Sequence, residues 1–361
     1  MTLARRIVRS GVRRFRTLTG LKEKPKKRIL SERKYLAPEP QGTPIRVAVL
    51  GAGRVSDFHL SVLNAFEAVK IVGLANRGNS DITAMGESYH VEKVFSNWRK
   101  MIEDTAPDAV LILVSHFETV PVTAAVLEMG IPCLIEKPAG FSSRQTSYLA
   151  DLAAKHSCLN MVAVNRRYYS VVDYALDAIY QNGPLVGALV EAHEPIAKMR
   201  KNSRHSQALL DRWLVANSIH PIDLLRCVGG DVSNIHVLRQ AWSGMPDSFS
   251  ASMQLQHNAL GTYVAHWSSV QGWSLQLYGN DIKVILNPLE EGEIIYSDGR
   301  RSLVPVDEVD LKFKPGIYAQ NAAFLHAVST GEALLPPCSD LADHVKTLQL
   351  IEDIAGTIHE D

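Results

Sequence analysis

The chain has 361 residues, and its first 44 carry 13 Lys and Arg against 3 Asp and Glu, which leaves 25 basic against 35 acidic residues in the remainder. At roughly 150 residues per domain, the remainder is typical of two domains, and an apolar fraction of 46% is ordinary for a protein with sizeable cores. Composition therefore excludes a disordered, collagen-like or disulfide-scaffold body.

The four cysteines are scattered, with no C-x-x-C pair and no Cys/His cluster at the spacing of a structural zinc site. We therefore expect reduced, mostly buried thiols and no metal. No apolar run approaches the ~18 residues that span a bilayer, and the N-terminus lacks an apolar segment followed by a cleavage site. The sequence favours a body that folds in a reducing, soluble compartment, the cytoplasm.

Residues 1–44 are predicted to form a basic leader and linker. On a helical wheel, residues 1–21 gather apolar side chains on one half and most arginines on the other, and no acidic residue precedes Glu23. A basic amphipathic helix of this kind docks on anionic membranes or partners, which is the interpretation we favour. The alternatives are a mitochondrial transit peptide and an inert tail. Nucleic acid is not an expected partner, because the body is acidic.

A β-branched run, Ile45–Leu50, leads directly into the turn G-A-G-R-V-S at residues 51–56. In a dinucleotide-binding turn the first glycine makes the bend, the second admits the pyrophosphate, and the third lets the helix pack closely; here Ser56 takes the third position. The following helix would direct its first amides at the phosphates. We predict that this turn binds a dinucleotide, through Gly51, Ala52, Gly53, Arg54 and Val55. The alternative is an ordinary strand-to-helix turn.

Strand-like and helix-like segments alternate from residue 70 to residue 164. Continuous apolar strands such as Ala109–Val114 are typical of a parallel sheet covered on both faces. We therefore predict a doubly wound α/β Rossmann domain over residues 45–165. The predicted segments are Lys70–Ala75, Ile82–Tyr89, Lys93–Phe95, Trp98–Ile102, Asp108–Val114, Val120–Met129, Pro132–Ile135, Ser143–Lys155 and Asn160–Val164.

The second predicted strand ends at Ala75-Asn76-Arg77, where an NAD enzyme usually has an acid for the ribose hydroxyls. Asn76 removes the charge that would repel a 2′-phosphate, and Arg77 can pair with that phosphate. These residues favour NADP. The alternative is NAD, with Arg77 stacked on the adenine and Asn76 bonded to the ribose.

Residues 136–138 (E-K-P) follow the fifth predicted strand, and residues 165–168 (N-R-R-Y) follow the sixth. A lysine at the carboxyl end of a parallel strand points into the crevice where nicotinamide sits. Together with the Gly51 turn and His59, eight residues later, these motifs resemble the glucose-fructose oxidoreductase and inositol dehydrogenase family (Gfo/Idh/MocA) over roughly residues 45–359.

The resemblance implies a C-terminal α/β domain, here residues 166–361, whose open, mostly antiparallel sheet closes the active site and often mediates assembly into a dimer or tetramer. The sequence agrees, because β-rich runs punctuated by turns follow residue 184. These runs are Leu185–Ala192, Ile235–Trp242, Ser250–Trp267, Ser274–Tyr278 and Lys283–Asn287. Two helices are predicted after them, around Ile317–Thr330 and Asp340–His359.

The family's lysine and histidine beside the reacting carbon correspond to Lys137 and His220, with Asp223 as the acid three residues after the histidine. The chemistry fits, because a His with an unperturbed pKa near 6.5 can take the hydroxyl proton as hydride leaves, and a lysine ammonium can stabilise the alkoxide. Many family members have an aspartate four residues before the histidine, where this chain has Ala216. Either His220 acts without it, oriented by Asn217 or Asp223, or the chemistry is lost.

Further candidates follow from position. Cofactor contacts are predicted for six residues at the ends of the fourth, fifth and sixth strands, and substrate contacts for five residues. The cofactor set is Ser115, His116, Glu136, Lys137, Asn165 and Arg166; the substrate set is Lys137, Arg167, Tyr168, His220 and Asp223. Interdomain salt bridges are the alternative for the arginines. Second-domain residues that could read the substrate are His193, Lys198, Arg200, Trp267 and Trp273, with core packing the default for the tryptophans.

The sequence thus predicts an NAD(P)-dependent oxidoreductase acting on a secondary hydroxyl or ketone of a sugar, cyclitol or nucleotide-linked sugar, with NADP slightly favoured. The first alternative is a non-catalytic dinucleotide or sugar sensor or scaffold, which Ala216 favours and retention of both Lys137 and His220 opposes. A second is reduction of an imine or tetrapyrrole-like double bond, which needs a proton donor but no alcohol base.

Overall fold

The computed structural model describes residues 38, 42–77, 82–201, 205–241, 246–270 and 272–356. The predicted basic helix over residues 1–21 lies outside these residues. In the part of the chain that is described, no helix is both long and apolar enough to cross a membrane.

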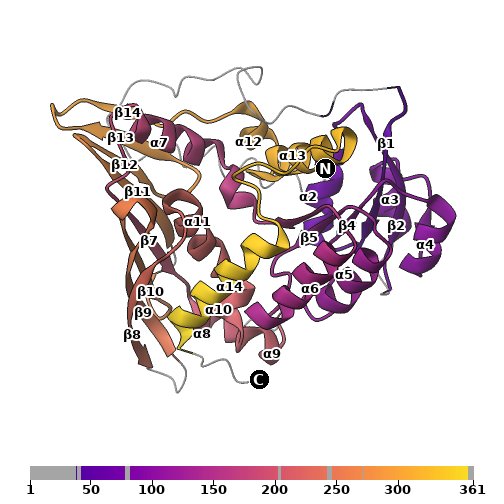
Figure 1. The fold of residues 1–361 in the computed structure, drawn as a ribbon, viewed down its shortest axis with the longest axis horizontal. Helices are drawn as coiled ribbons and strands as arrows, with labels where there is room; N and C mark the ends of the chain where they lie inside the picture. Colours follow the sequence, from indigo (N-terminus) through magenta and orange to yellow (C-terminus); the bar gives the residue numbers. More distant parts are fainter. Residues whose placement is uncertain are drawn as a thin grey trace.

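The first half of the chain forms a six-stranded parallel sheet with the order β3-β2-β1-β4-β5-β6, drawn from indigo to magenta in Figure 1. The order reverses between β1 and β4, and ligands of such sheets bind outside the carboxyl ends of the strands at this point. The doubly wound prediction is confirmed. The strands are β1 (Ile45–Leu50), β2 (Val69–Ala75), β3 (Val94–Phe95), β4 (Ala109–Ile112), β5 (Cys133–Glu136) and β6 (Asn160–Ala163).

Helices connect these strands, and local capping fixes where several begin. The Asn97 side chain accepts hydrogen bonds from two backbone amides at the start of α4, and Ser142 does the same for one amide of α6. Such caps satisfy amides that have no partner within the helix. The helices are α2 (Arg54–Leu63), α3 (Ile82–Ser88), α4 (Trp98–Thr105), α5 (Thr119–Glu128) and α6 (Ser143–Lys155).

The second sheet has eight strands in the order β14-β13-β12-β11-β7-β10-β9-β8, on the left of Figure 1. Only the β7 and β10 pair is parallel, so the predicted mostly antiparallel sheet is confirmed. The strands are β7 (Gly187–His193), β8 (Asn234–Ala241), β9 (Pro246–Gln254), β10 (Leu260–His266), β11 (Gly272–Gly279), β12 (Ile282–Leu286), β13 (Gly292–Tyr296) and β14 (Arg301–Leu303).

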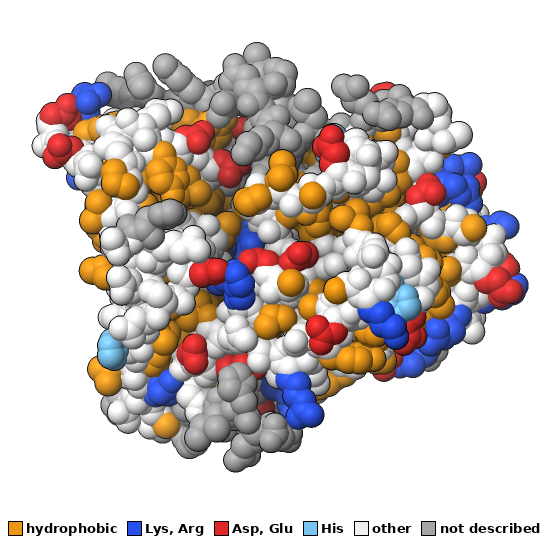
Figure 2. Space-filling view, viewed as in Figure 1, with side chains coloured by type: hydrophobic (Ala, Val, Ile, Leu, Met, Phe, Trp, Pro, Cys, Tyr) orange, Lys and Arg blue, Asp and Glu red, His pale blue; other side chains and the backbone are white. Residues whose placement is uncertain are grey.

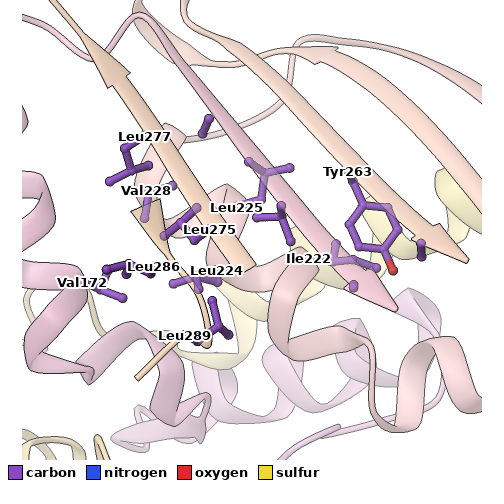
Figure 3. Close-up of a cluster of buried hydrophobic side chains, with 14 of the residues drawn as sticks. Val172, Ile222, Leu224, Leu225, Val228, Tyr263, Leu275, Leu277, Leu286 and Leu289 are labelled. Atoms are coloured by element: carbon purple, nitrogen blue, oxygen red, sulfur yellow. The ribbon is translucent and has the colours of Figure 1, made fainter. Parts of the chain in front are cut away.

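Two helices, α7 (Ser170–Tyr180) and α11 (Ile219–Gly229), cover one face of this sheet. Between them and the strands lies the larger hydrophobic core, part of which is shown in Figure 3. Ile222, Leu224 and Leu225 of α11 are completely buried in it. This packing holds α11 firmly, and with it the first-turn residue His220.

The remaining elements are short connections and C-terminal helices. They are the 3-10 helices η3 (Asn165–Tyr168) and η4 (Gln256–Asn258), and α8 (Ile196–Lys201), α9 (Gln207–Leu210), α10 (Trp213–Ala216), α12 (Glu308–Lys312), α13 (Ile317–Thr330) and α14 (Leu341–Ala355). α14 packs against both α6 and α11, and in Figure 1 it runs between the two halves. α13 packs with α2 in the core of the first sheet, which the predicted boundary at residue 166 does not anticipate.

The surface seen in Figure 2 carries acidic, basic and hydrophobic side chains interspersed over both halves. A nucleic-acid-binding face is instead marked by clustered Lys and Arg. The face seen in Figure 2 therefore gives no support to the binding of nucleic acid by clustered basic side chains.

Candidate active site

The turn between β1 and α2 has the shape that a dinucleotide requires. Gly51 has a φ of +106°, and a Cβ atom on it would lie 2.2 Å from the Leu113 carbonyl oxygen, so only glycine fits there. A Cβ on Gly53 would meet nothing within 4 Å, which leaves the second glycine open to a ligand. The Ser56 hydroxyl donates to the Gly51 carbonyl at 2.8 Å and closes the turn in place of a third glycine.

The start of α2 is suited to phosphate. Its N-cap, Gly53, makes no side-chain hydrogen bond, so the first amides are left without a side-chain partner. Arg54 is exposed beside Gly53, while Ala52 and Val55 are half-buried. These residues fit the pyrophosphate of a dinucleotide, through backbone amides and one guanidinium group.

At the end of β2, Asn76 is half-buried and Arg77 is exposed. The Arg77 guanidinium pairs with the Glu118 carboxylate at 2.9 Å, with 81% of the Arg77 side chain exposed. Both residues stand at the carboxyl edge of the sheet, where a ribose would lie. Arg77 is therefore held by Glu118 at the edge where a ribose would lie.

The ends of β4 and β5 bring three predicted residues together. His116 is half-buried and stacks on Phe141 at a ring-centroid distance of 6.2 Å, while Ser115 is exposed. Burial, with the nearby charge of Lys137, lowers the pKa of His116 to about 4. His116 is therefore neutral near pH 7 and close enough to Lys137 to sense its charge.

Lys137, directly after β5, is the central polar group where the two halves of the chain meet, the position expected for the crevice. Its Nζ in the first half donates to the Ala216 carbonyl oxygen in the second half at 2.9 Å. Burial lowers the pKa of Lys137 to about 8, against the opposing charge of Glu136. Burial also raises the pKa of Glu136, to about 7. Lys137 thus titrates near neutral pH, as an acid-base group requires.

His220 lies in the first turn of α11 and is 4% exposed. Its Nε2 is 2.9 Å from Nη1 of Arg166. Since a guanidinium only donates hydrogen bonds, Nε2 must be the unprotonated acceptor and Nδ1 carries the proton. Nδ1 is buried and makes no hydrogen bond to any residue that the structure describes. Burial and the charge of Arg166 lower the pKa of His220 well below its usual range.

This environment differs from the one assumed for His220 from the sequence. A base with an ordinary pKa near 6.5 needs solvent or a carboxylate beside it, whereas His220 faces a cation in a buried site. Position 216 supplies a backbone carbonyl to Lys137 rather than a carboxylate to His220. The geometry therefore makes His220 a neutral hydrogen-bonding group.

One of the two tryptophans considered from the sequence lies beside His220 and Arg166. Trp273 of β11 is half-buried, with its ring centroid 6.2 Å from that of His220 and 5.5 Å from the Arg166 guanidinium carbon. Trp267 is instead buried against Phe249, as the core default predicts.

Arg166 also donates to its neighbour Asn165 at 2.6 Å, which in turn donates to the Pro315 carbonyl. Of the other second-domain candidates, His193 stacks on His266 and Arg200 is exposed, while the side chain of Lys198 is outside the described part.

Three residues predicted to contact substrate lie elsewhere. Arg167 is 4% exposed and forms a bidentate ion pair with Asp223, at 2.7 and 2.6 Å. Tyr168 is fully buried and donates to Cys338 Sγ at 3.0 Å. The structure places these three side chains in the interior, where Arg167 forms a buried salt bridge, although its partners Asp223 and Asp343 belong to the same predicted domain, residues 166–361.

The sequence prediction omitted Glu194, which follows β7 and is 1% exposed. Its carboxylate accepts hydrogen bonds from Trp213 Nε1, Asn217 Nδ2 and Ser218 Oγ. A glutamate that ends a β-rich run has no distinctive motif, so only the fold reveals it. Among the described residues, no group of three or more His, Cys, Asp or Glu side chains is arranged to hold a metal ion.

Comparison with known proteins agrees with this geometry. Residues 45–164 match the model of the Gfo/Idh/MocA family, an oxidoreductase family with an NAD-binding Rossmann fold. The uncharacterized oxidoreductase YrbE of Bacillus subtilis is 28% identical over 34% of this chain and 36% of its own length. Inositol 2-dehydrogenase of Corynebacterium glutamicum is 25% identical over 60% of this chain and 65% of its own length. The matched region is thus less than two thirds of either relative.

Solved structures extend the similarity to the fold of both halves. Levoglucosan dehydrogenase, in complex with NADH and levoglucosan, has a TM-score of 0.74 at 16% identity, covering 87% of this chain and 97% of that one. At this identity the likeness establishes the shared fold. Over residues 45–164 the chain is therefore similar to the NAD-binding Rossmann domain of the Gfo/Idh/MocA oxidoreductase family.

Proposed function

We propose that the protein is an NAD(P)-dependent oxidoreductase that interconverts a secondary hydroxyl and a ketone on a sugar, cyclitol or nucleotide-linked sugar. One observation carries the proposal: Lys137 of the first half donates to Ala216 of the second at 2.9 Å, four residues before His220. This contact lies at the carboxyl edge of the parallel sheet, where the nicotinamide of a Rossmann enzyme sits.

The residues divide the proton chemistry between them. A nicotinamide held by the Gly51 turn and the start of α2 would supply the hydride chemistry at the carbinol carbon. Lys137, as the free amine, takes the hydroxyl proton during oxidation and as ammonium returns it during reduction, which suits a pKa of about 8. His220 is neutral, and its Nδ1–H has no acceptor among the residues that the structure describes. It can therefore donate to a substrate oxygen and orient the hydroxyl group.

The cofactor site fits either dinucleotide through the Gly51 turn and the start of α2. We propose that NADP is preferred, because Arg77 stands at the ribose position and no acidic side chain replaces Asn76. An exposed pair such as Arg77 and Glu118 contributes about 0–1 kcal/mol, so a 2′-phosphate can displace Glu118 at little cost.

The substrate class rests on two kinds of support. The related proteins include an inositol 2-dehydrogenase and a levoglucosan dehydrogenase, whose names specify a cyclitol and a sugar derivative. Within the crevice, the half-buried Trp273 ring lies beside His220, and such a ring can stack on a sugar face. Assembly into a dimer or tetramer, and membrane docking by residues 1–21, stay predictions.

The test begins with binding. Quenching of protein fluorescence by NADH and NADPH should report micromolar dissociation constants, and the tighter cofactor should then be used with a panel of sugars, cyclitols and sugar nucleotides. Turnover on a panel member that is lost in Lys137→Met, while cofactor binding persists, supports alcohol oxidation with Lys137 as the acid-base group. Binding without turnover on any member favours the sensor or scaffold alternative, and failure to bind either cofactor contradicts the proposal.

A further inference from the structure

Glu194 is a buried carboxylate close to the crevice, with no assigned role. It lies directly after β7, in the second half of the chain, and is 1% exposed. Burying a carboxylate is unfavourable unless its oxygens are fully hydrogen-bonded. The buried Glu194 carboxylate therefore needs several hydrogen-bond donors around it.

Those partners come from one short segment. Glu194 Oε2 accepts from the Trp213 indole and from Asn217 Nδ2 at 2.6 Å, and Oε1 accepts from Ser218 Oγ at 2.5 Å. Residues 213–218 comprise α10 and the N-cap of α11. One carboxylate thus fastens this segment to the end of β7 at three points.

The same segment provides the hydrogen-bond acceptor of Lys137. Ala216, between Trp213 and Asn217, receives the Lys137 ammonium on its carbonyl oxygen at 2.9 Å. Burial raises the pKa of Glu194, while the charge of Lys137 opposes this rise; the charge of Glu194 in turn favours the ammonium form of Lys137. Glu194 therefore acts on Lys137 through geometry and through charge.

We infer that Glu194 is a positioning residue for Lys137, holding residues 213–218 so that the Ala216 carbonyl receives the ammonium group and supplying a buried negative charge that favours it. The inference rests on the proposed function for its catalytic meaning, but the Lys137–Ala216–Glu194 arrangement exists without substrate.

Several charged or titratable groups face Lys137 from different elements. The charge of Glu136, which adjoins Lys137 on β5, raises the pKa of Lys137, whereas the charge of Arg166 of η3 lowers it. The two histidines are His116, after β4, and His220, in the first turn of α11. Both histidines have lowered pKa values, so they carry no charge near pH 8. Within this set, Glu194 is the charged group that follows β7 and favours the ammonium form of Lys137.

The titration of Lys137 tests the charge without requiring substrate. The full chain would be labelled with acetic anhydride at a series of pH values, and acetylation of Lys137 measured by mass spectrometry. In Glu194→Gln the midpoint should fall by about 0.5 to 1 pH unit, because removal of a nearby anion favours the neutral amine. Glu191→Gln is the matched control, because this glutamate lies on the same strand and accepts instead from Ser274 at 2.7 Å.

Position is tested with variants that keep the charge. Glu194→Asp and Ser218→Ala should leave the Lys137 midpoint near that of the wild type, yet lower kcat by about tenfold to a hundredfold with little change in KM, because the acceptor shifts. These two variants also decide the matter if Glu194→Gln does not fold. A folded Glu194→Gln protein with an unchanged midpoint, or unchanged kcat in both other variants, would overturn the inference. Absence of turnover in the wild type would contradict the proposed function instead, leaving the labelling result to stand.

Discussion

Arg166 and Arg167 are neighbours in the sequence, but their side chains lie in two different regions. Arg166 enters the crevice, where it donates to His220 at 2.9 Å and faces Trp273. Arg167 enters the interior, where it pairs with Asp223 and, at 2.9 Å, with Asp343 of α14. One short motif therefore supplies both a group that lies beside His220 and a group that ties η3 to α11 and α14.

The first turn of α11 is divided in the same way. His220 faces the crevice, whereas Asp223, three residues later, accepts from Arg167 and from the Thr347 hydroxyl of α14 at 2.8 Å. Arg226, one turn further along, joins the network through Asp343 and Asp231. Lys137 and Arg166 hydrogen-bond to neutral groups, while the interior network pairs each buried cation with carboxylates. This contrast predicts that substitutions in the two regions affect different properties.

The largest expected effect is on turnover, in the crevice. Lys137→Met keeps most of the side-chain volume and removes the amine that exchanges the substrate proton. The kcat value should fall about 10²- to 10⁴-fold, which is the usual contribution of an acid-base group. Thermal unfolding should change little, because Met tolerates burial. Lys155→Met, at the exposed end of α6, is the matched control and should leave turnover at the wild-type level.

The next largest effect is on stability, in the interior network. Arg167→Met leaves the Asp223 carboxylate buried without its bidentate partner, and breaking a buried pair on one side costs about 3–5 kcal/mol of unfolding free energy. Urea denaturation would measure the loss. Arg166→Met is the matched comparison, since it should impair activity while unfolding at nearly the same urea concentration. Equal destabilisation by the two substitutions would abolish the contrast between the regions.

The fold followed from the sequence because its signals are local. Alternating apolar segments and the Gly51 turn defined the parallel sheet, and the predicted helix bounds of α6 and α13 match those observed. The assignment of α13 to the second domain did not anticipate its packing, because α13 returns to the first core across more than 150 residues of chain. An apolar helix face does not specify which core it will join.

The site was only partly predictable, because the contacts of several of its residues are made with partners distant in the sequence. The sequence identified Lys137 and His220 by their motifs, and the structure brings them to one crevice. It could not separate Arg166 from Arg167, because the direction of each side chain depends on η3 and on partners from α11 and α14. Glu194 went unnoticed because its three partners lie 19 to 24 residues away.

A third prediction concerns pH. Burial lowers the pKa of Lys137 to about 8, so the free amine should increase about tenfold between pH 7 and pH 9. The kcat/KM for alcohol oxidation should rise over this interval, and that for ketone reduction should fall. The interior network should not contribute to this pH dependence. Arg226 and Arg167 hold the pKa of Asp343 well below its usual range, so the ion pairs of Asp343 are lost only in acid. A single limb near pH 6.5 would instead indicate a histidine base.

The smallest expected effect separates an exposed ion pair from the buried one. Arg77→Ser removes a guanidinium that is 81% exposed and paired with Glu118, so unfolding free energy should change by less than about 1 kcal/mol. If Arg77 reads a 2′-phosphate, the dissociation constant of NADPH should rise about fivefold while that of NADH stays the same. Glu118→Gln should act in the opposite direction, because it removes the competing carboxylate and leaves Arg77 available to the phosphate. Wild-type protein that binds NADH as tightly as NADPH would contradict the preference, and would assign Arg77 to its pair with Glu118 alone.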